Sequence, residues 1–208
     1  SADYLYRNID KSKIQYIHNA IDTEKFNYQE DIRNQIREKH DLKDNLVLGH
    51  VGNFQYPKNH MFLLEIMKEY HQINPNAKLL LCGDGELRES IEKRIKEYHL
   101  EENVILLGVC DNVSEYMQAF DILLHPSFYE GFPVVTVEAQ CSGLPLLLSD
   151  TLTKEVALTD HVEFLAIDGD QAVKQWTDAI ERIRCHAFER KNQSEIIAKK
   201  GYDIRIEA

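Results

Sequence analysis

Cysteine is scarce in this sequence, and the few that occur are not arranged to bind metal or to form disulfides. The four cysteines lie far apart, without a C-x-x-C pair. A disulfide framework and a zinc cage are therefore not predicted, and a reducing setting is expected. The nine histidines also lack the H-x-x-x-H and H-E-x-x-H spacings of metal sites. We therefore expect no metal site and no metal cofactor.

Long apolar runs and an excess of positive charge are missing as well. No run approaches the roughly 20 apolar residues that a membrane helix needs, and residues 1–10 contain no signal-peptide core. The 24 Lys and Arg are outnumbered by 35 Asp and Glu, which gives a formal net charge of −11. Such a charge repels polyanions, so nucleic acid and anionic membrane surfaces are not expected partners. These features predict a cytoplasmic chain without a membrane span.

Short hydrophobic runs alternate with helical patterns along most of the chain. The 208 residues, 43% of them hydrophobic, suffice for one domain, which we place at residues 1–208. The runs are rich in Val, Ile and Leu, as strands covered on both faces should be. This alternation predicts an α/β fold with a Rossmann-like, doubly wound parallel sheet. The expected strands are residues 46–51, 77–82, 104–107, 121–125 and 144–149, with further strands at 162–166 and 14–17.

The segments between these runs have the apolar spacing of amphipathic helices. A polar helix over residues 29–40 is expected to cover the sheet edge. Near the end of the chain, Asp168 and Asp170 form a D-x-D pair before a helix whose Trp176 should face the core. Although a D-x-D pair can bind a metal, this position favours Asp170 as the N-cap of the helix. The crossover helices should bury Leu63, Ile66, Met67 and Tyr70 in one case and Leu87, Ile91, Ile95 and Tyr98 in the other.

The stretch from residue 126 to residue 145 carries the most specific pattern. It reads PSFYEGFPVVTVEAQCSGLP and directly follows a predicted strand. Pro133 suits the first position of a helix, because its ring fixes φ and it lacks only an N–H that would be unpaired there. We therefore expect a helix that starts near Phe132. Ligands of a doubly wound sheet bind at the carboxyl ends of the strands, so this loop is a candidate site.

The start of this helix is predicted to bind an anion between two carboxylates. Glu130 should lie in the loop above the sheet, and Glu138 about one and a half turns into the helix. Gly131 would allow a ligand or a second backbone to come close. Unpaired N–H groups at a helix N-terminus form a phosphate site. Here those groups would belong to Val134, Val135 and Thr136.

The loop after the first strand, VGNFQYPKNH, is the second candidate. Gly52 ends the predicted strand, and Lys58 stands just before a helix. Because this is the first βα loop of the sheet, Lys58 is a candidate cation for a phosphate ligand.

The pattern E-G-F-P-x-V-x-x-E-A-x-x-x-G-x-P resembles the E-x7-E motif of glycosyltransferase family 4, which are retaining enzymes of the GT-B fold. The resemblance implies that Glu130 contacts the donor sugar and that Glu138 holds the ribose hydroxyls. It also implies that the backbone after the first glutamate contacts the diphosphate. The donor site is therefore expected to include Gly131, Phe132, Pro133, Val134 and Val135.

Other segments are similar to the same family. The family's G-R-x…K-[GN] segment is matched at Gly52, Lys58 and Asn59, but Asn53 stands where an arginine is expected. An asparagine can donate a hydrogen bond but brings no charge, so compensation of the second phosphate charge is in doubt. The C-G-D-G and N-V-I-L-L-G segments resemble family segments near the donor. They add Gly83, Leu107 and Gly108 as candidate ligand contacts, although a simple strand-to-helix turn also explains the G-x-G.

The resemblance covers most of residues 13–149 and implies the second of the family's two domains, without the first, acceptor-binding domain. It predicts a transferase acting on a nucleotide diphosphate sugar and a saccharide or lipid-linked acceptor, with Glu130 and Lys58 as the catalytic residues of this chain and no metal required. The isolated chain is expected to be inactive, and a place at the inner face of the membrane is left open for the full-length protein. The alternatives are a GT-B epimerase or phosphorylase and a non-catalytic nucleotide-sugar-binding module. We interpret His125 as a packed residue at a strand end.

Overall fold

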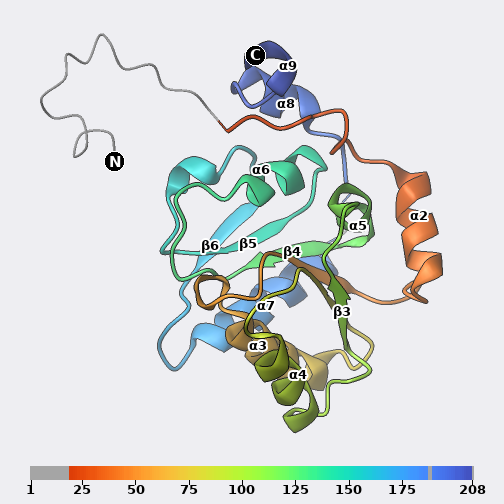
Figure 1. The fold of residues 1–208 in the computed structure, drawn as a ribbon, viewed down its shortest axis with the longest axis vertical. Coiled ribbons are helices and arrows are strands. Elements are labelled where there is room, and N and C mark those ends of the chain that lie inside the picture. Colours follow the sequence, from red (N-terminus) through yellow and green to blue (C-terminus); the bar gives the residue numbers. More distant parts are fainter. Residues whose placement is uncertain (1–18, 187–188, 208) are drawn as a thin grey trace, which may run out of the picture.

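The computed structural model describes residues 19–186 and 189–207, which fold around a six-stranded parallel sheet (Figure 1). The strand order is β3-β2-β1-β4-β5-β6, the order of a doubly wound nucleotide-binding sheet. The predicted fold class and all six strands from residue 46 onward are confirmed, whereas residues 14–17 lie outside the described residues. The strands are β1 (Val47–Val51), β2 (Lys78–Cys82), β3 (Val104–Gly108), β4 (Ile122–His125), β5 (Leu146–Ser149) and β6 (Val162–Leu165).

Helices cover both faces of the sheet (Figure 1). One face carries α3 (His60–Ile73), α4 (Arg88–Glu97) and α7 (Ala172–Cys185). The other face carries α2 (Glu30–Lys39), α5 (Val113–Ala119), α6 (Val134–Cys141) and α8 (Ser194–Lys199). Shorter helical turns are η2 (Tyr56–Lys58), η3 (Lys154–Val156) and α9 (Ile204–Glu207).

Alternate residues of each strand enter different hydrophobic clusters, because successive side chains of a strand point to opposite faces. In β2, Leu79 and Leu81 pack with α3, α4 and α7, whereas Leu80 packs with α5 and α6. Trp176 of α7 is fully buried in the first cluster, as predicted. The apolar residues expected on the two crossover helices are likewise buried or packed against this cluster.

Two local predictions are wrong. The helix predicted at residues 29–40 is present as α2, but it packs mainly against α5 and not on a sheet edge. The helix after the D-x-D pair begins only at Ala172, and its N-cap residue Gln171 makes no side-chain cap. Gly169 adopts a left-handed φ of 85°, and its carbonyl accepts from the amide of Ala172. The turn at Gly169 therefore moves the helix start past Asp170, which does not serve as the N-cap.

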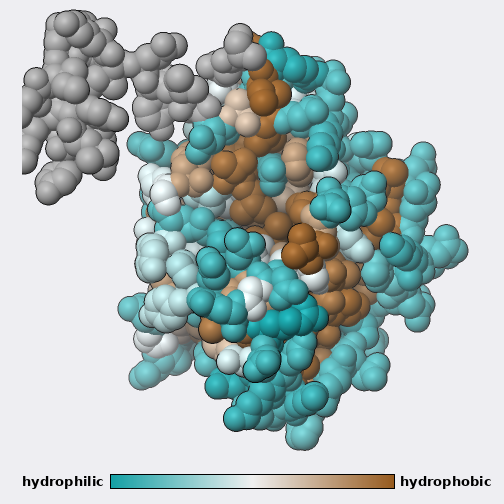
Figure 2. All heavy atoms as spheres, in the orientation of Figure 1, coloured by the Kyte–Doolittle hydropathy of each residue, from teal (hydrophilic) through white to brown (hydrophobic). Residues whose placement is uncertain are grey.

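The surface is mixed in character. Figure 2 shows hydrophobic residues extending from the C-terminal helices towards the middle of the visible face, with hydrophilic residues around them. Ile196, Ile204 and Ile206 of α8 and α9 are among the exposed large hydrophobic residues. No helix within residues 19–186 and 189–207 has both the length and the apolar character needed to cross a membrane.

Candidate functional site

The candidate site lies where the strand order of the sheet reverses. β1 pairs with β2 on one side and with β4 on the other. The chain runs outward from β1 through β2 to β3 and then returns to β4. The loops after β1 and β4 therefore leave the sheet in different directions, and ligands of such sheets bind in the crevice between them. Both loops singled out from the sequence belong to this pair of strands.

Backbone and ring contacts fasten these two loops to each other. The amide of Phe128 donates to the carbonyl of Pro57 at 2.8 Å. The rings of Tyr56 and Phe128 stack with their centroids 4.9 Å apart. Asn59, in the left-handed conformation that asparagine tolerates, donates from Nδ2 to the carbonyl of Pro126 at 3.2 Å. The two loops are thus held in one relative position by the chain itself.

Lys58 and Glu130 meet across this junction. The Nζ atom of Lys58 lies 2.6 Å from Oε1 of Glu130, and their side chains are 22% and 14% exposed. The same oxygen accepts from Ser127 Oγ at 2.8 Å and lies 2.7 Å from Nε2 of His125. The structure therefore brings the two predicted catalytic residues together.

These donors determine the charge state of Glu130. Burial by itself would raise the pKa of the carboxyl group. The hydrogen bonds from His125, Lys58 and Ser127 outweigh burial and lower the pKa to about 2. Glu130 is therefore a carboxylate at any physiological pH.

Sequence reasoning missed a cluster of buried histidines behind this pair. His50 and His125 stack with ring centroids 5.6 Å apart, and the rings of His50 and His60 are 4.8 Å apart. Burial lowers the pKa of all three, to about 4 for His60, so the rings are neutral at pH 7. A signal for His125 was available, since it ends β4 and lies five residues before Glu130. Among the described residues, no group of three or more His, Cys, Asp or Glu side chains is arranged to hold a metal ion.

Gly52 provides the path that Lys58 follows to Glu130. A Cβ at this position would lie 3.1 Å from Cδ and 3.2 Å from Cε of Lys58, and 3.2 Å from Nε2 of His50. Such contacts are tighter than ordinary van der Waals distances. A glycine at the end of β1 therefore lets the lysine side chain cross the strand end.

Glu138 differs from Glu130 in having no partner among residues 19–186 and 189–207. Its carboxylate is half-buried in α6 and makes no hydrogen bond or ion pair with the described residues. Burial raises its pKa, and the charge of Lys25 only partly offsets this. A half-buried carboxylate without donors is costly, so a ligand with hydroxyl groups would stabilise it.

The start of α6 corrects the sequence prediction. The helix begins at Val134, and Pro133 is its N-cap residue with an extended ψ of 97° rather than its first helical residue. The amide of Thr136 already donates to the carbonyl of Pro133 at 3.0 Å. The first two helical amides, those of Val134 and Val135, have no such partner in the described part of the chain. The ring of Phe132 stacks on the ring of Tyr202, with the centroids 5.6 Å apart. The contact predicted between Phe132 and the sugar donor would therefore involve its backbone.

The glycines of the other candidate loops serve different purposes. A Cβ on Gly83 would lie 2.1 Å from the carbonyl oxygen of Gly52, so Gly83 lets the loops after β1 and β2 touch. This supports the strand-to-helix turn as one reason for the glycine. A Cβ on Gly131 would meet nothing within 4 Å, and its φ is not positive. The described fold itself therefore does not require a glycine at position 131.

Three other predicted contacts lie at the same edge of the sheet. Leu107 is half-buried near the end of β3, and Gly108 follows it with a left-handed φ of 71°. Asn53 is exposed after β1, and no hydrogen bond of its side chain is found among the described residues.

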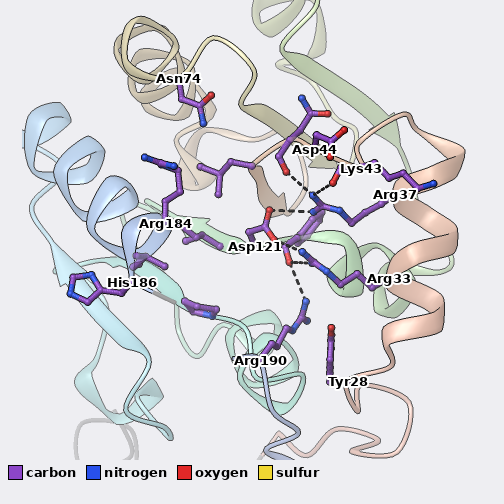
Figure 3. A pocket seen from close by; sticks show the side chains of 16 residues that line it. Tyr28, Arg33, Arg37, Lys43, Asp44, Asn74, Asp121, Arg184, His186 and Arg190 are labelled. Atoms are coloured by element: carbon purple, nitrogen blue, oxygen red, sulfur yellow. Dashed lines mark hydrogen bonds and ion pairs between the residues drawn. The ribbon is translucent and has the colours of Figure 1, made fainter. Parts of the chain in front are cut away.

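A cavity of about 550 Å³ lies at the opposite edge, where β1, β4 and β5 begin (Figure 3). Several arginines line it, but their guanidinium groups already bind the protein. Arg190 donates to the carbonyls of Met117, Gln118, Phe120 and Ser142. Arg33 and Arg37 both pair with Asp121 and donate to carbonyls of the same turn. These arginines hold the end of α5, and the cavity offers no free cluster of cations.

The described sheet has the Rossmann-like α/β fold that forms one half of a GT-B glycosyltransferase. In the solved structure of Anabaena Alr3699/HepE in complex with UDP and glucose, 57% of that chain matches 98% of this one, with a TM-score of 0.80 and 18% identity. At that identity the likeness shows the fold.

The family follows from the sequence as a whole. The model of the family "Glycosyl transferases group 1" matches residues 32–200, and the chain belongs to this family. The putative glycosyltransferase EpsF of Bacillus subtilis is 33% identical over 201 residues, which are 95% of this chain and 52% of that protein. The UDP-Gal:alpha-D-GlcNAc-diphosphoundecaprenol alpha-1,3-galactosyltransferase of Escherichia coli is 31% identical over 149 residues, covering 68% of this chain and 38% of that protein. The chain thus spans about half the length of EpsF and less of the second relative.

Proposed function

We propose that this chain is the donor-binding domain of a retaining glycosyltransferase of family 4. The full protein would move a sugar from a nucleotide diphosphate sugar to a saccharide or lipid-linked acceptor, in cell-surface polysaccharide synthesis. The observation that carries the proposal is the Lys58–Glu130 ion pair at the switch point. It offers a cation for a diphosphate and a carboxylate for sugar hydroxyls in one place. The names of the Escherichia coli relative and of the HepE complex, which contain a UDP sugar, UDP and glucose, support this class of donor.

The proposed chemistry is stabilisation of the departing phosphate. In transfer from a nucleotide diphosphate sugar, negative charge builds up on the leaving phosphate while the anomeric carbon becomes cationic. Lys58 and the free amides at the start of α6 would meet that charge with a fixed cation and fixed dipoles. These groups would do so without a divalent metal.

The two glutamates would have separate roles. Glu130 would hold the donor sugar, and Glu138 would accept from the ribose hydroxyls. The surroundings of the two carboxyl groups fit this division. Three hydrogen-bond donors lower the pKa of Glu130, whereas Glu138 has no hydrogen-bond donor among the described residues and its pKa is raised. Glu130 would position the sugar and not attack it, since its Oε1 is already occupied by protein donors.

The experiment is a thermal-shift panel with UDP, GDP and ADP sugars, the matching diphosphates and the bare nucleosides. A ligand at 100 times its Kd adds about 2.7 kcal/mol of stability, which gives a clear rise in Tm. We expect one family of nucleotide sugars and its diphosphate to raise the Tm and the nucleoside to do so far less. If no nucleotide sugar or diphosphate shifts the Tm at millimolar concentration, the proposal fails.

Asn53 favours a non-catalytic binding module as the second candidate. The residue is exposed and uncharged at the position where an arginine would add a second cation beside Lys58. Turnover in the full-length protein distinguishes the two candidates. Nucleotide-sugar binding together with steady sugar transfer supports the enzyme, whereas binding without transfer or donor hydrolysis supports the module.

The 208 residues alone should bind a nucleotide diphosphate and transfer no sugar. The match covers only 52% of EpsF and 57% of the HepE chain, so we expect these residues alone to leave the acceptor unpositioned. Positioning of two reactants contributes on the order of 7 to 11 kcal/mol to a transfer barrier. Robust transfer by this chain alone, measured with a radiolabelled donor, would contradict the half-enzyme interpretation.

A further inference from the structure

The three donors on Oε1 of Glu130 differ in whether a ligand can reach them. Lys58 is 22% exposed and lies at the crevice, whereas the side chain of His125 is fully buried and Ser127 is buried as well. Under the proposed function, Lys58 turns to the diphosphate when a donor binds. Only His125 and Ser127 then remain on the carboxylate of Glu130.

We propose that His125 is a positioning residue that donates to the carboxylate of Glu130 and keeps it oriented for the donor sugar once Lys58 has turned to the diphosphate. The inference rests on the proposed function and adds a residue that acts through Glu130 without touching the ligand.

The ring of His125 has the tautomer that this role requires. Its Nδ1 is buried without a hydrogen-bond partner in the described part of the chain, while Nε2 lies 2.7 Å from Oε1 of Glu130. A carboxylate can only accept, so the proton is on Nε2 and the ring donates it. Burial lowers the pKa of His125, so this donor is neutral at pH 7. Because the His125 ring is neutral and buried, the charge of a bound phosphate does not pull it away from Glu130.

The neighbouring elements hold this ring in place. The ring of His50 stacks on it, and Nδ1 of His50 donates to the carbonyl of Leu124 at 2.9 Å, one residue before His125. Because β1 and β4 are paired strands, the stacking joins His125 to the centre of the sheet. His125 is therefore fixed independently of the loop that carries Glu130.

The charged and titratable groups around Glu130 and His125 are few. β1 contributes His50, the turn η2 contributes Lys58, and α3 contributes His60. Burial lowers the pKa of both of these histidines, so neither is charged between pH 5.5 and 8. A difference in pH dependence between a His125 variant and the wild type in this range can therefore be assigned to Glu130.

The test measures Kd by calorimetry for UDP-glucose and UDP, or for GDP-mannose and GDP if guanine is preferred, between pH 5.5 and 8. His125→Leu removes the donor, and we expect the affinity for the nucleotide sugar to fall about tenfold relative to the diphosphate. This deficit should grow towards pH 5.5, because Glu130 loses a donor that keeps it ionised. Each ratio is divided by that of the wild type at the same pH, because the terminal phosphate of the diphosphate itself titrates at about pH 6.

Comparison of His125→Gln with His125→Asn decides whether the donor at Nε2 matters. This comparison tests the inference even if His125→Leu does not fold. The amide nitrogen of glutamine reaches the place of Nε2, whereas that of asparagine reaches only the place of Nδ1. Glutamine should restore the affinity ratio to within about threefold of the wild type, and asparagine should not. Equal ratios in the glutamine and asparagine variants, or a wild-type ratio in His125→Leu, would overturn this inference alone. A wild type that binds neither ligand would instead defeat the proposed function, and this inference with it.

Discussion

The backbone amide of Phe128 donates to the carbonyl of Pro57 at 2.8 Å, although 71 residues separate them along the chain. This bond joins the loop after β4 to the loop after β1 beside the Lys58–Glu130 pair. Its consequence is preorganisation: the crevice has its cation and its carboxylate in place before a ligand arrives. A ligand then only has to replace Glu130 as the partner of Lys58. It does not have to order either loop.

Removal of the Lys58 charge should weaken diphosphate ligands far more than the bare nucleoside. A charge-assisted hydrogen bond contributes about 1.5–3 kcal/mol, so Lys58→Ala should cost tenfold or more in the Kd for nucleoside diphosphate. Lys93→Ala, on the exposed face of α4, is the matched control. Calorimetric titration measures both, and an unchanged Kd for the diphosphate in Lys58→Ala would show that this lysine is not its ligand.

Glu138 and Glu130 should affect different parts of the donor. Glu138→Ala removes the proposed ribose acceptor and should weaken nucleotide and nucleotide sugar alike. Glu130→Gln should leave free nucleotide binding nearly intact and impair binding of the sugar donor. Titrations of both variants with UDP and UDP-glucose test this division, which fails if the two substitutions have equal effects on the plain nucleotide.

Gly131→Ala should lower the affinity for the sugar donor without destabilising the fold. The new methyl group would meet no atom within 4 Å, so the Tm should change by no more than about 1–2 °C. Donor affinity should fall, because the methyl group would occupy space that the ligand approaches. Gly143→Ala is the contrasting glycine, since its Cβ would lie 1.9 Å from the carbonyl oxygen of Lys191, and it should lower the Tm strongly. Wild-type donor affinity in Gly131→Ala would remove this residue from the site.

Glu130 should make the fold sensitive to acid. Its pKa in the folded state is about 2, below the ordinary value of 4.5. A depressed carboxyl pKa contributes stability that is present above the ordinary pKa and is lost as the pH falls towards the folded value. The free energy of unfolding should therefore fall between about pH 5 and pH 2, and less steeply in Glu130→Gln. Urea unfolding at several pH values measures this difference, and parallel curves for the two proteins would refute it.

The sheet and the site residues Lys58 and Glu130 were predictable because their signals are local in the sequence. Runs such as Leu79–Leu80–Leu81 mark buried parallel strands, and the spacing around Glu130 marks the loop after one of them. The spacing places His125 and Ser127 close to Glu130, but it does not predict that their side chains bind its carboxylate. Ser127 and His125 reach its carboxylate because the loop turns back over the end of β4, and that path depends on its junction with the other loop.

The errors at helix starts have a related cause. Pro133 has the φ of a first helical residue, but its ψ is extended and the helix begins one residue later. Asp170 has the chemistry of an N-cap, yet the turn at Gly169 moves the helix start beyond it. In both cases a single backbone angle overrides the preference of the residue type.

Arg190 has a consequence for the order in which the chain assembles. Its guanidinium group binds carbonyls at the end of α5 and at Ser142, 48 to 73 residues earlier in the chain. Those acceptors come together only when α5, β4 and the turn after α6 have taken their places. We therefore expect the segment that carries Arg190 to dock after these elements have formed. By the same reasoning, the amides of α8 behind it should exchange their hydrogens sooner than those of β1 and β4.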